Sequence, residues 1–305
     1  NHHQKRLHQG ICGGETRDYT MSKVKDYMQS PVYVIDKEEP VQRARNLMLK
    51  HYISRLLVMD GDKLAGIVTK HDISHRLSQA APEWRRRPIS KVPVKLVMTD
   101  RPITIYPGAT VEQAAEIMDE NGIDGLPVER DGGEIVGIIT SRDLLSYFVE
   151  KNPDSKVSDL MSQGVVSVHR HHTLDHVLEE MVENGVDRVV VCEDNATPVG
   201  VITHTNLAIS GVSDAKDELK GKSIKMARKE STAGRKGYRY VKEVPLVAED
   251  IMSYPILFTN SEVKAVDAAK ILLDKEICGL PVVDDERVVG FFSTRDITAE
   301  VARWS

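Results

Sequence analysis

Apolar and polar positions follow the same order four times along the chain. Each copy opens with a short segment that ends on a methionine, and an apolar stripe begins thirteen residues later. The stripe has the three- and four-residue spacing of one helix face. The four stripes are Val41/Ala44/Met48, Val111/Ala114/Met118, Leu174/Val177/Met181 and Ala265/Ala268/Leu272. The pattern predicts a helix at the same place in each copy.

Two short apolar segments with a polar turn between them follow each predicted helix. They read LLVM, LPVE, VVVC and LPVV, and then a segment that begins on Gly66, Gly137, Gly200 or Gly290. The offset from methionine to glycine is 38, 39, 39 and 38 residues, so the copies differ only within a turn, where a change of length is tolerated. A further helical stretch closes each copy. We therefore predict strand, helix, strand, strand, helix in every repeat, an α+β fold.

The spacing between copies predicts how they pair. The four glycines are 71, 63 and 90 residues apart, which groups the copies as first with second and third with fourth. A unit of about 60 residues buries its apolar faces poorly alone, so pairing is expected. We assign residues 21–80 to repeat 1, 91–152 to repeat 2, 153–212 to repeat 3 and 246–305 to repeat 4. Residues 1–20 are interpreted as a disordered or vector-derived tail, and 213–245 as a basic linker.

Composition excludes several classes of protein. The chain has 305 residues, a formal net charge of −5 and three widely spaced cysteines, which argues against a disulfide scaffold or a protein that coats nucleic acid. No apolar run approaches the roughly 18 residues of a membrane span, so we expect a cytoplasmic protein. Two connections are nevertheless basic: WRRRPISK, and residues 216–242, with ten Lys or Arg against three Asp or Glu. A solvated surface is the usual meaning of such runs, and contact with nucleic acid is the alternative.

Four motifs identify a family. GIVTKHD, GIITSRD, GVITHTN and GFFSTRD occupy the same position in the four repeats, and the repeats resemble CBS domains. Each pair is similar to a Bateman module, and the four tandem copies resemble the gamma subunit of AMP-activated protein kinase and its stand-alone archaeal relatives. The resemblance implies four βαββα units, arranged as two Bateman modules in a disc-like assembly.

The end of each motif has two interpretations. A hydroxyl followed three residues later by an acid is a helix-capping arrangement. The resemblance implies instead that the acid accepts hydrogen bonds from both ribose hydroxyls of an adenine nucleotide, with the hydroxyl residue beside it. The matching pairs are Thr69/Asp72, Thr140/Asp143, Thr203/Asn206 and Ser293/Asp296. Asn206 departs from the pattern, because its NH₂ group donates rather than accepts.

The resemblance also implies basic groups that bind phosphates in a central channel. The candidates are Arg55, Arg142, Arg188, Arg295 and His71. Repeats 2 and 4 have glycine at the start of the middle strand and arginine before the acid. Repeats 1 and 3 have arginine at the start of the middle strand, and His71 and Thr205 at the second position. Solvated surface salt bridges are the alternative for any single arginine. The adenine is expected against the first strands and residues such as Ile53 and Ile123, whose alternative role is ordinary core packing.

We therefore expect a non-catalytic regulatory protein. Adenine nucleotides (AMP, ADP or ATP) are the expected regulatory ligands, with no catalytic residue, catalytic cofactor or metal site. The expected partners are an unidentified regulated protein and a second copy of the chain, without a membrane. The alternatives are a sensor of S-adenosylmethionine or methylthioadenosine, a nucleic-acid-binding protein that uses the basic linkers, and a scaffold with vestigial clefts.

Overall fold

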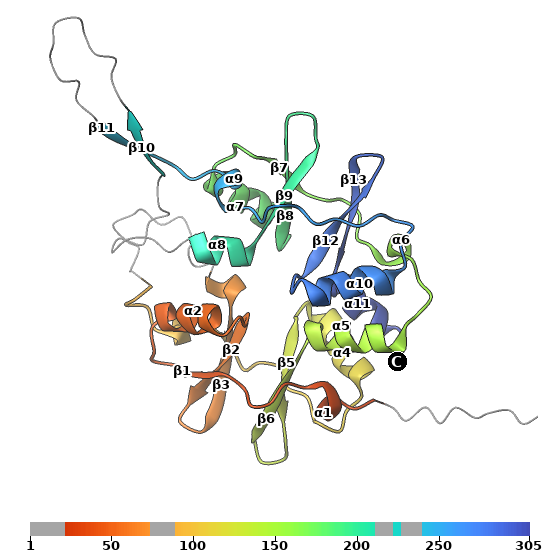
Figure 1. Ribbon diagram of the computed structural model, residues 1–305. Helices are drawn as coiled ribbons and strands as arrows, with labels where there is room; N and C mark the ends of the chain where they lie inside the picture. The colour runs from red at the N-terminus through yellow and green to blue at the C-terminus, as the bar shows by residue number, and fades with distance from the viewer. Residues whose placement is uncertain (1–21, 74–88, 211–221, 227–239) are drawn as a thin grey trace, which may run out of the picture.

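The four repeats form a ring in the computed structural model, which describes residues 22–73, 89–210, 222–226 and 240–305 (Figure 1). Repeats 1 and 2 make one half of the ring, and repeats 3 and 4 make the other. This arrangement confirms the predicted α+β fold of two paired modules. The N-terminal tail, Trp84 and most of the basic linker lie outside the described residues, so the predictions for them stay predictions.

The elements recur in the predicted order. The first module contains α1 (Val24–Tyr27), β1 (Val34–Asp36), α2 (Val41–Lys50), β2 (Arg55–Asp60) and β3 (Lys63–Thr69), then η2 (Val94–Leu96), β4 (Thr99–Asp100), α4 (Val111–Asn121), β5 (Gly125–Glu129), β6 (Ile135–Thr140) and α5 (Ser141–Lys151). The second module contains α6 (Val157–Leu160), β7 (Ser167–His169), α7 (Leu174–Glu183), β8 (Arg188–Cys192), β9 (Pro198–Thr203) and α8 (His204–Ser210), then α9 (Ala248–Ile251), α10 (Ala265–Asp274), β12 (Gly279–Asp284), β13 (Arg287–Ser293) and α11 (Thr294–Ala302). Between its two repeats, β10 (Lys222–Met226) and β11 (Tyr240–Val244) form an antiparallel hairpin.

The first predicted strand of repeats 2 and 4 is reduced to a single bridge, at Ile105 and Thr259. The cause lies in the middle strand. In repeat 1 the Leu57 N–H donates to the Tyr33 carbonyl, which extends the parallel pairing of β1 with β2. The equivalent residues are Pro127 and Pro281, and proline has no N–H to donate. The ladder therefore shortens in these two repeats.

The recurring methionines and glycines meet across each pair of repeats. A Cβ built on Gly137 of repeat 2 would lie 2.6 Å from the sulfur of Met28 in repeat 1, and one on Gly66 would lie 2.7 Å from that of Met98. The second module repeats the exchange, with 2.5 Å from Gly200 to Met252 and 2.7 Å from Gly290 to Met161. Any side chain at these glycines would overlap the methionine, so each repeat supplies a methionine that only its partner's glycine accommodates.

Backbone hydrogen bonds extend the exchange beyond the methionine. The residue after Met28 pairs with Ile138 in both directions, at 2.8 and 3.0 Å, and Ser162 pairs in the same way with Phe291. The segment that opens each repeat therefore lies along the last strand of its partner. A single repeat lacks this contact, which agrees with the expectation that the units pair.

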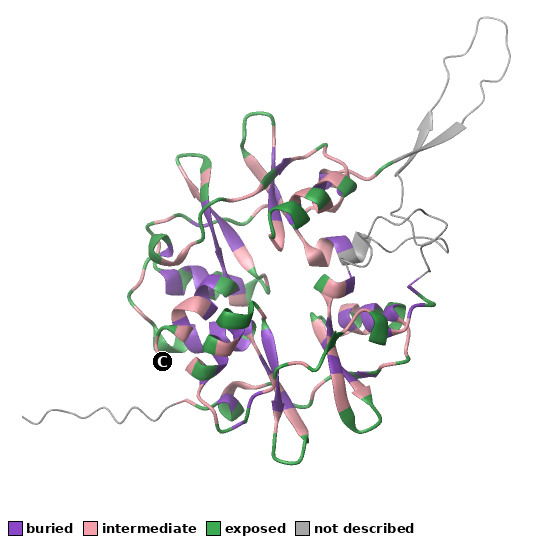
Figure 2. Cartoon of the chain, turned by 180° about the vertical axis from the view of Figure 1, so that it is seen from behind, coloured by how far each residue is buried: buried purple, intermediate pink, exposed green. Residues whose placement is uncertain are grey.

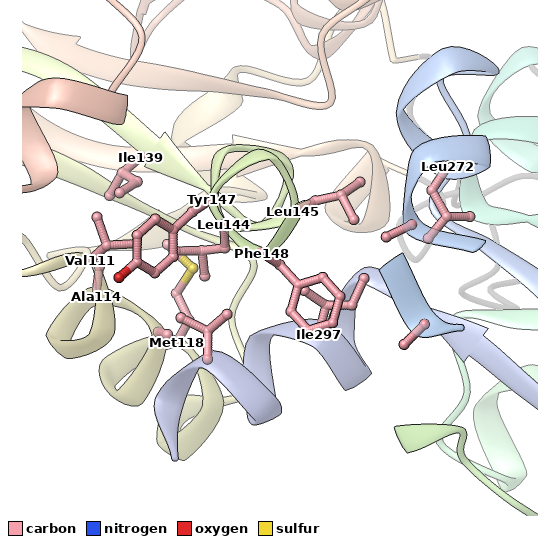
Figure 3. Packing of buried hydrophobic residues seen from close by; sticks show 14 of the residues in the cluster. Val111, Ala114, Met118, Ile139, Leu144, Leu145, Tyr147, Phe148, Leu272 and Ile297 are labelled. Carbon is pink, nitrogen blue, oxygen red and sulfur yellow. The ribbon is translucent and has the colours of Figure 1, made fainter. Parts of the chain in front are cut away.

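The cores show how the two modules join. One cluster of buried apolar residues includes both repeat 2 and repeat 4, where α11 packs on α4 and α5. Figure 3 shows Leu144 and Phe148 of α5 between α4 and the helices of repeat 4. Most buried residues of repeat 1 and of repeat 3 form two further clusters, while Val24 and Val157 belong to the shared one. A small cluster of Val190, Cys192 and Phe291 lies between repeats 3 and 4. Buried residues line the strands and the facing helices, whereas the hairpin turns at the rim are exposed (Figure 2).

Within the ranges that the structure describes, every helix is too short or too polar to cross a membrane.

A double-mutant cycle tests the methionine–glycine contact. Gly200→Ala should lower the free energy of unfolding by about 1–3 kcal/mol, because its Cβ overlaps the Met252 side chain. Met252→Ala should also destabilise the protein, since it removes a partly buried side chain. Urea unfolding of the double variant should show a loss at least about 0.5 kcal/mol smaller than the sum of the single losses. Additive losses would show that the two residues do not share one contact.

Candidate functional site

The capping interpretation holds in all four repeats. The backbone N–H and hydroxyl of Thr69 both donate to Oδ2 of Asp72 at 2.7 Å. Thr140 and Ser293 make the same two bonds at 2.7 Å to Asp143 and Asp296. Each arrangement joins a strand end to the first turn of the next helix. Only one carboxylate oxygen, Oδ2, takes part in the cap, so Oδ1 is available for other contacts.

The second oxygen faces the partner repeat. Gln29 Nε2 donates to Oδ1 of Asp143 at 2.8 Å, and the Ser162 hydroxyl donates to Oδ1 of Asp296. Both donors directly follow an exchanged methionine. In repeat 1, Oδ1 of Asp72 lies 3.9 Å from His71 Nδ1. Asp143 and Asp296 therefore sit where two paired repeats meet, with one oxygen in a cap and the other at the boundary.

Asn206 uses both ends of its amide within the protein. Its Oδ1 accepts from the Thr203 N–H at 2.9 Å and hydroxyl at 2.8 Å, as the acids do. Its Nδ2 donates to the Ile251 carbonyl at 2.9 Å and the Ser253 hydroxyl at 3.1 Å. The asparagine thus preserves the cap and joins repeat 3 to repeat 4, where an acid would have placed an acceptor against a carbonyl.

Apolar side chains follow the donor segments. Tyr33 and Val34 come just after Gln29 and are 46% and 49% exposed. Similar exposed residues occur in repeats 2 and 4, namely Ile103, Tyr106, Tyr254, Leu257 and Phe258. In repeat 3 the matching residues are Val166, which is half-buried, and the polar Ser167. These segments are the predicted first strands, so three repeats present apolar surface beside a carboxylate or amide of the partner.

Ile53 and Ile123 are half-buried and pack against the cores of their own repeats. Each stands two residues before the start of the middle strand. Core packing accounts for their contacts, and their role as adenine neighbours stays a prediction.

The alternation of arginine with glycine has a steric cause. A Cβ on Gly125 would overlap the guanidinium of Arg55, and a Cβ on Gly279 would lie 2.6 Å from Nη1 of Arg188. The two residues of each pair occupy equivalent positions in paired repeats. Arg188 is further held by a 3.2 Å hydrogen bond to the Cys278 carbonyl. Only one arginine fits at each of these contacts.

Groups from all four repeats gather around these arginines. Arg55 lies 3.9 Å from Asp124 of repeat 2, and Arg295 of repeat 4 lies 3.8 Å from Asp187 of repeat 3. His71 of repeat 1 packs edge-on against His204 of repeat 3, with ring centroids 4.5 Å apart. We call these six residues the central cluster. Of the predicted phosphate ligands, it contains Arg55, Arg295 and His71, while Arg188 adjoins it and Arg142 is exposed on α5.

Burial and opposite charges shift the pKa values in the central cluster. Burial lowers the pKa of Arg55, with the charge of Asp124 acting against it. An arginine nonetheless stays protonated, so it holds a positive charge that is poorly solvated. The interaction with His204, followed by the charge of Arg295, lowers the pKa of Asp187 to about 2 against the effect of burial. Interaction with Asp72 raises the pKa of His71, again against burial.

Asp187, His204 and Asp124 were not among the predicted site residues. Asp124 and Asp187 occupy the position just before the arginine or glycine of the middle strand, where the other repeats have Ser54 and Cys278. Only two of the four residues are aspartates, so a comparison of repeats does not mark the position. Its constant register beside the arginine–glycine position is the signal that identifies it.

The histidine-rich loop of repeat 3 lies outside the central cluster. It lines a surface pocket of about 330 Å³ together with Glu193, Asp194 and Asn195. Arg170 bridges Glu193 and Glu249, with nitrogen–oxygen distances of 2.7 Å in both ion pairs. These contacts connect the loop to the segment that opens repeat 4.

Comparison with known proteins finds matches along almost the whole chain. The model of the CBS domain matches residues 24–79, 90–150, 157–210 and 247–303. Uncharacterized protein MJ1404 of Methanocaldococcus jannaschii is 24% identical over 284 residues, which cover 92% of this chain and 62% of that protein. Inosine-5'-monophosphate dehydrogenase of Korarchaeum cryptofilum is 32% identical over 133 residues, 44% of this chain and 25% of the enzyme. The chain thus spans less than two thirds of either relative.

The crystal structure of protein MJ1225 from Methanocaldococcus jannaschii, presented as a candidate archaeal homologue of the AMP-activated protein kinase gamma subunit, has the same fold. It superposes with a TM-score of 0.76 at 21% identity and covers 91% of this chain and 99% of that one. The resemblance predicted from the four motifs is confirmed. The chain belongs to the CBS-domain family, of which it carries four copies.

Proposed function

We propose that the chain is a non-catalytic regulatory protein that binds adenine nucleotides between paired CBS repeats. One observation carries the proposal: Asp143 and Asp296 lie against the exchanged segment of the partner repeat, which continues into apolar side chains. A carboxylate and an apolar surface at one boundary suit the ribose and the adenine of a single ligand.

The ribose contact uses the free side of the cap. A carboxylate accepts only, and it can take two hydroxyl donors at once. In repeats 2 and 4, ribose hydroxyls would replace Gln29 and Ser162 at Oδ1 while Oδ2 keeps the cap. Asp72 offers Oδ1 beside His71. Asn206 already donates to two groups of repeat 4, so we propose that repeat 3 does not hold a ribose.

The phosphate contact uses the central cluster. Arg55 and Arg295 approach it from repeats 1 and 4, and their guanidinium groups can bind phosphate oxygens with two parallel hydrogen bonds. Asp124 and Asp187 lie 3.8 to 3.9 Å from these arginines, which is beyond hydrogen-bond distance. A phosphate would therefore find donors that the protein has positioned but not saturated. His71 would add a third basic group.

Regulation follows from the place of the ligand. A molecule that touches two repeats and the central cluster binds best in one relative arrangement of the repeats, and differential affinity of this kind shifts a conformational equilibrium. At a concentration of about 100 times Kd, a ligand contributes roughly 2.7 kcal/mol. The regulated partner would be another protein in the cytoplasm, and a second copy of the chain is a further proposed partner.

Substitution of the acids by asparagine tests the ribose contact, because Asn206 shows that asparagine preserves the cap. Asp72→Asn, Asp143→Asn and Asp296→Asn should each weaken one class of AMP site by about tenfold or more, through loss of a charge-assisted hydrogen bond of about 1.5–3 kcal/mol. Isothermal titration calorimetry resolves the classes, and the triple variant should bind AMP more weakly at every one of them.

Asp159→Asn is the matched control, since Asp159 caps the short helix α6 by accepting from the Lys156 N–H at 2.8 Å. It makes the same change of charge away from the acids, and it should leave AMP binding unchanged. Normal titration curves for the triple variant would show that these carboxylates do not bind AMP.

Substitution of the arginines tests the phosphate contact. Arg55→Met and Arg295→Met together should weaken ATP binding by about tenfold or more, because two guanidinium contacts are lost, and should leave binding of methylthioadenosine unchanged. Arg130→Met, in an exposed hairpin turn, is the control. If methylthioadenosine binds the original protein tightly and ATP does not, the alternative ligand class is correct. Binding of an oligonucleotide alone would favour the basic linkers.

Asn206→Asp tests the assignment of repeat 3. The carboxylate would face the Ile251 carbonyl in place of a donor, so the free energy of unfolding should fall by about 1–3 kcal/mol. Asn195→Asp, in an exposed turn where the side chain only accepts, should change it little. Equal stability of the two variants in urea unfolding would show that the amide does not join the repeats.

A further inference from the structure

Three side chains with metal-binding groups converge where the two modules meet. His71, Asp187 and His204 each offer one ligand atom, and these atoms all lie within 4.8 Å of one another. Within the described ranges, no other three histidine, cysteine or acidic side chains gather so closely. Asp187 Oδ1 lies 3.6 Å from His204 Nε2. The group includes both modules, because His71 comes from repeat 1.

We propose that His71, Asp187 and His204 bind a divalent transition-metal ion of the Zn²⁺ class. Two imidazoles and one carboxylate are a ligand set that such ions prefer, whereas Mg²⁺ and Ca²⁺ take oxygen ligands. A tetrahedral ion with bonds of about 2.0–2.2 Å requires ligand atoms roughly 3.3–3.5 Å apart. The pair Asp187–His204 already has nearly this spacing. A water or a fourth group would complete the shell.

The local fold positions two of the three ligands. Arg188 and Thr203 are partners in the β8–β9 ladder, so Asp187 and His204 lie side by side where that hairpin ends. Their separation is therefore set by backbone pairing. His71 belongs to the helical turn 70–73, and its side chain is 54% exposed.

The charges around the site suit a cation that binds through one oxygen. Asp187 is ionised at neutral pH and divides its oxygens: Oδ1 faces His204, and Oδ2 faces Arg295 at 3.8 Å. Arg295 is 54% exposed on its side of the carboxylate and can turn away from a bound dication. A second carboxylate, Asp124, contributes to the electrostatic environment of His71.

A bound ion would cross-link the two modules. Repeats 2 and 4 share one core, whereas most buried residues of repeats 1 and 3 lie in two different clusters. The proposed ion joins repeat 1 directly to repeat 3. His71 is shared with the proposed phosphate contact, whereas Asp187 and His204 are not proposed to touch the nucleotide, so their substitution tests the metal site separately.

Co²⁺ titration of the full chain tests the proposal, with Zn²⁺ as competitor. His2, His3 and His8 are replaced by glutamine in every protein, so that the tail adds no ligands. We expect one ion per chain, with the intense visible absorption of four-coordinate Co²⁺, and a melting temperature raised by Zn²⁺ but not by Mg²⁺. Outer-shell substitutions weaken metal binding about 10- to 100-fold, so Asp187→Asn and His204→Gln should weaken it at least tenfold.

His171→Gln is the matched control, because His171 lies in the histidine-rich loop and is 66% exposed. It should bind Co²⁺ as tightly as the parent. The proposal is overturned if the parent binds no Co²⁺, if Asp187→Asn binds it normally, or if His171→Gln alone abolishes binding. Circular dichroism of the metal-free variants checks that they fold. Should His204→Gln fail to fold, Asp187→Asn, which keeps the size of the side chain, decides the outcome.

Discussion

The contact between a methionine of one repeat and a glycine of its partner fixes the geometry of each module. It brings the opening segment of one repeat along the last strand of the other, and backbone pairs at Gln29–Ile138 and Ser162–Phe291 hold it there. Asp143 and Asp296 meet the partner's segment only because of this exchange. The proposed ligand sites are therefore properties of a pair of repeats, and no isolated repeat contains one.

Self-comparison of the sequence predicted much of this fold. The constant offset from methionine to glycine marked the repeats, and the unequal spacing of the glycines paired them correctly. The offset relates residues within one repeat, however, whereas the contact joins residues of two. The constant offset therefore does not tell which glycine contacts Met28, because tertiary packing decides it. Pro127 and Pro281 are visible in the sequence, but they shorten the first strands only because the equivalent Leu57 N–H donates to the first strand. That hydrogen bond is known only from the strand pairing in the structure.

The candidate site was predictable where the repeats agree. The hydroxyl–acid pairs recur, and the structure shows that they are caps whose second oxygen lies at a repeat boundary. The role of that oxygen in ribose binding remains a prediction. Asp187 and His204 could not be found by recurrence, because only repeat 2 has a second aspartate at the position of Asp187, and His204 is the only histidine at its position among the four repeats. Their importance comes from a contact between modules, and repeat comparison carries no information about such contacts.

The arginine that lies over a glycine removes the twofold symmetry of each module. Two paired repeats would otherwise be exchangeable by a half-turn, but the space beside Gly125 is filled by Arg55 and cannot hold a second arginine. A half-turn therefore no longer superposes the module on itself, and its two faces are chemically different. A partner that docks on the disc meets a front and a back rather than two equal sides. One missing side chain in every second repeat therefore gives the pair an orientation.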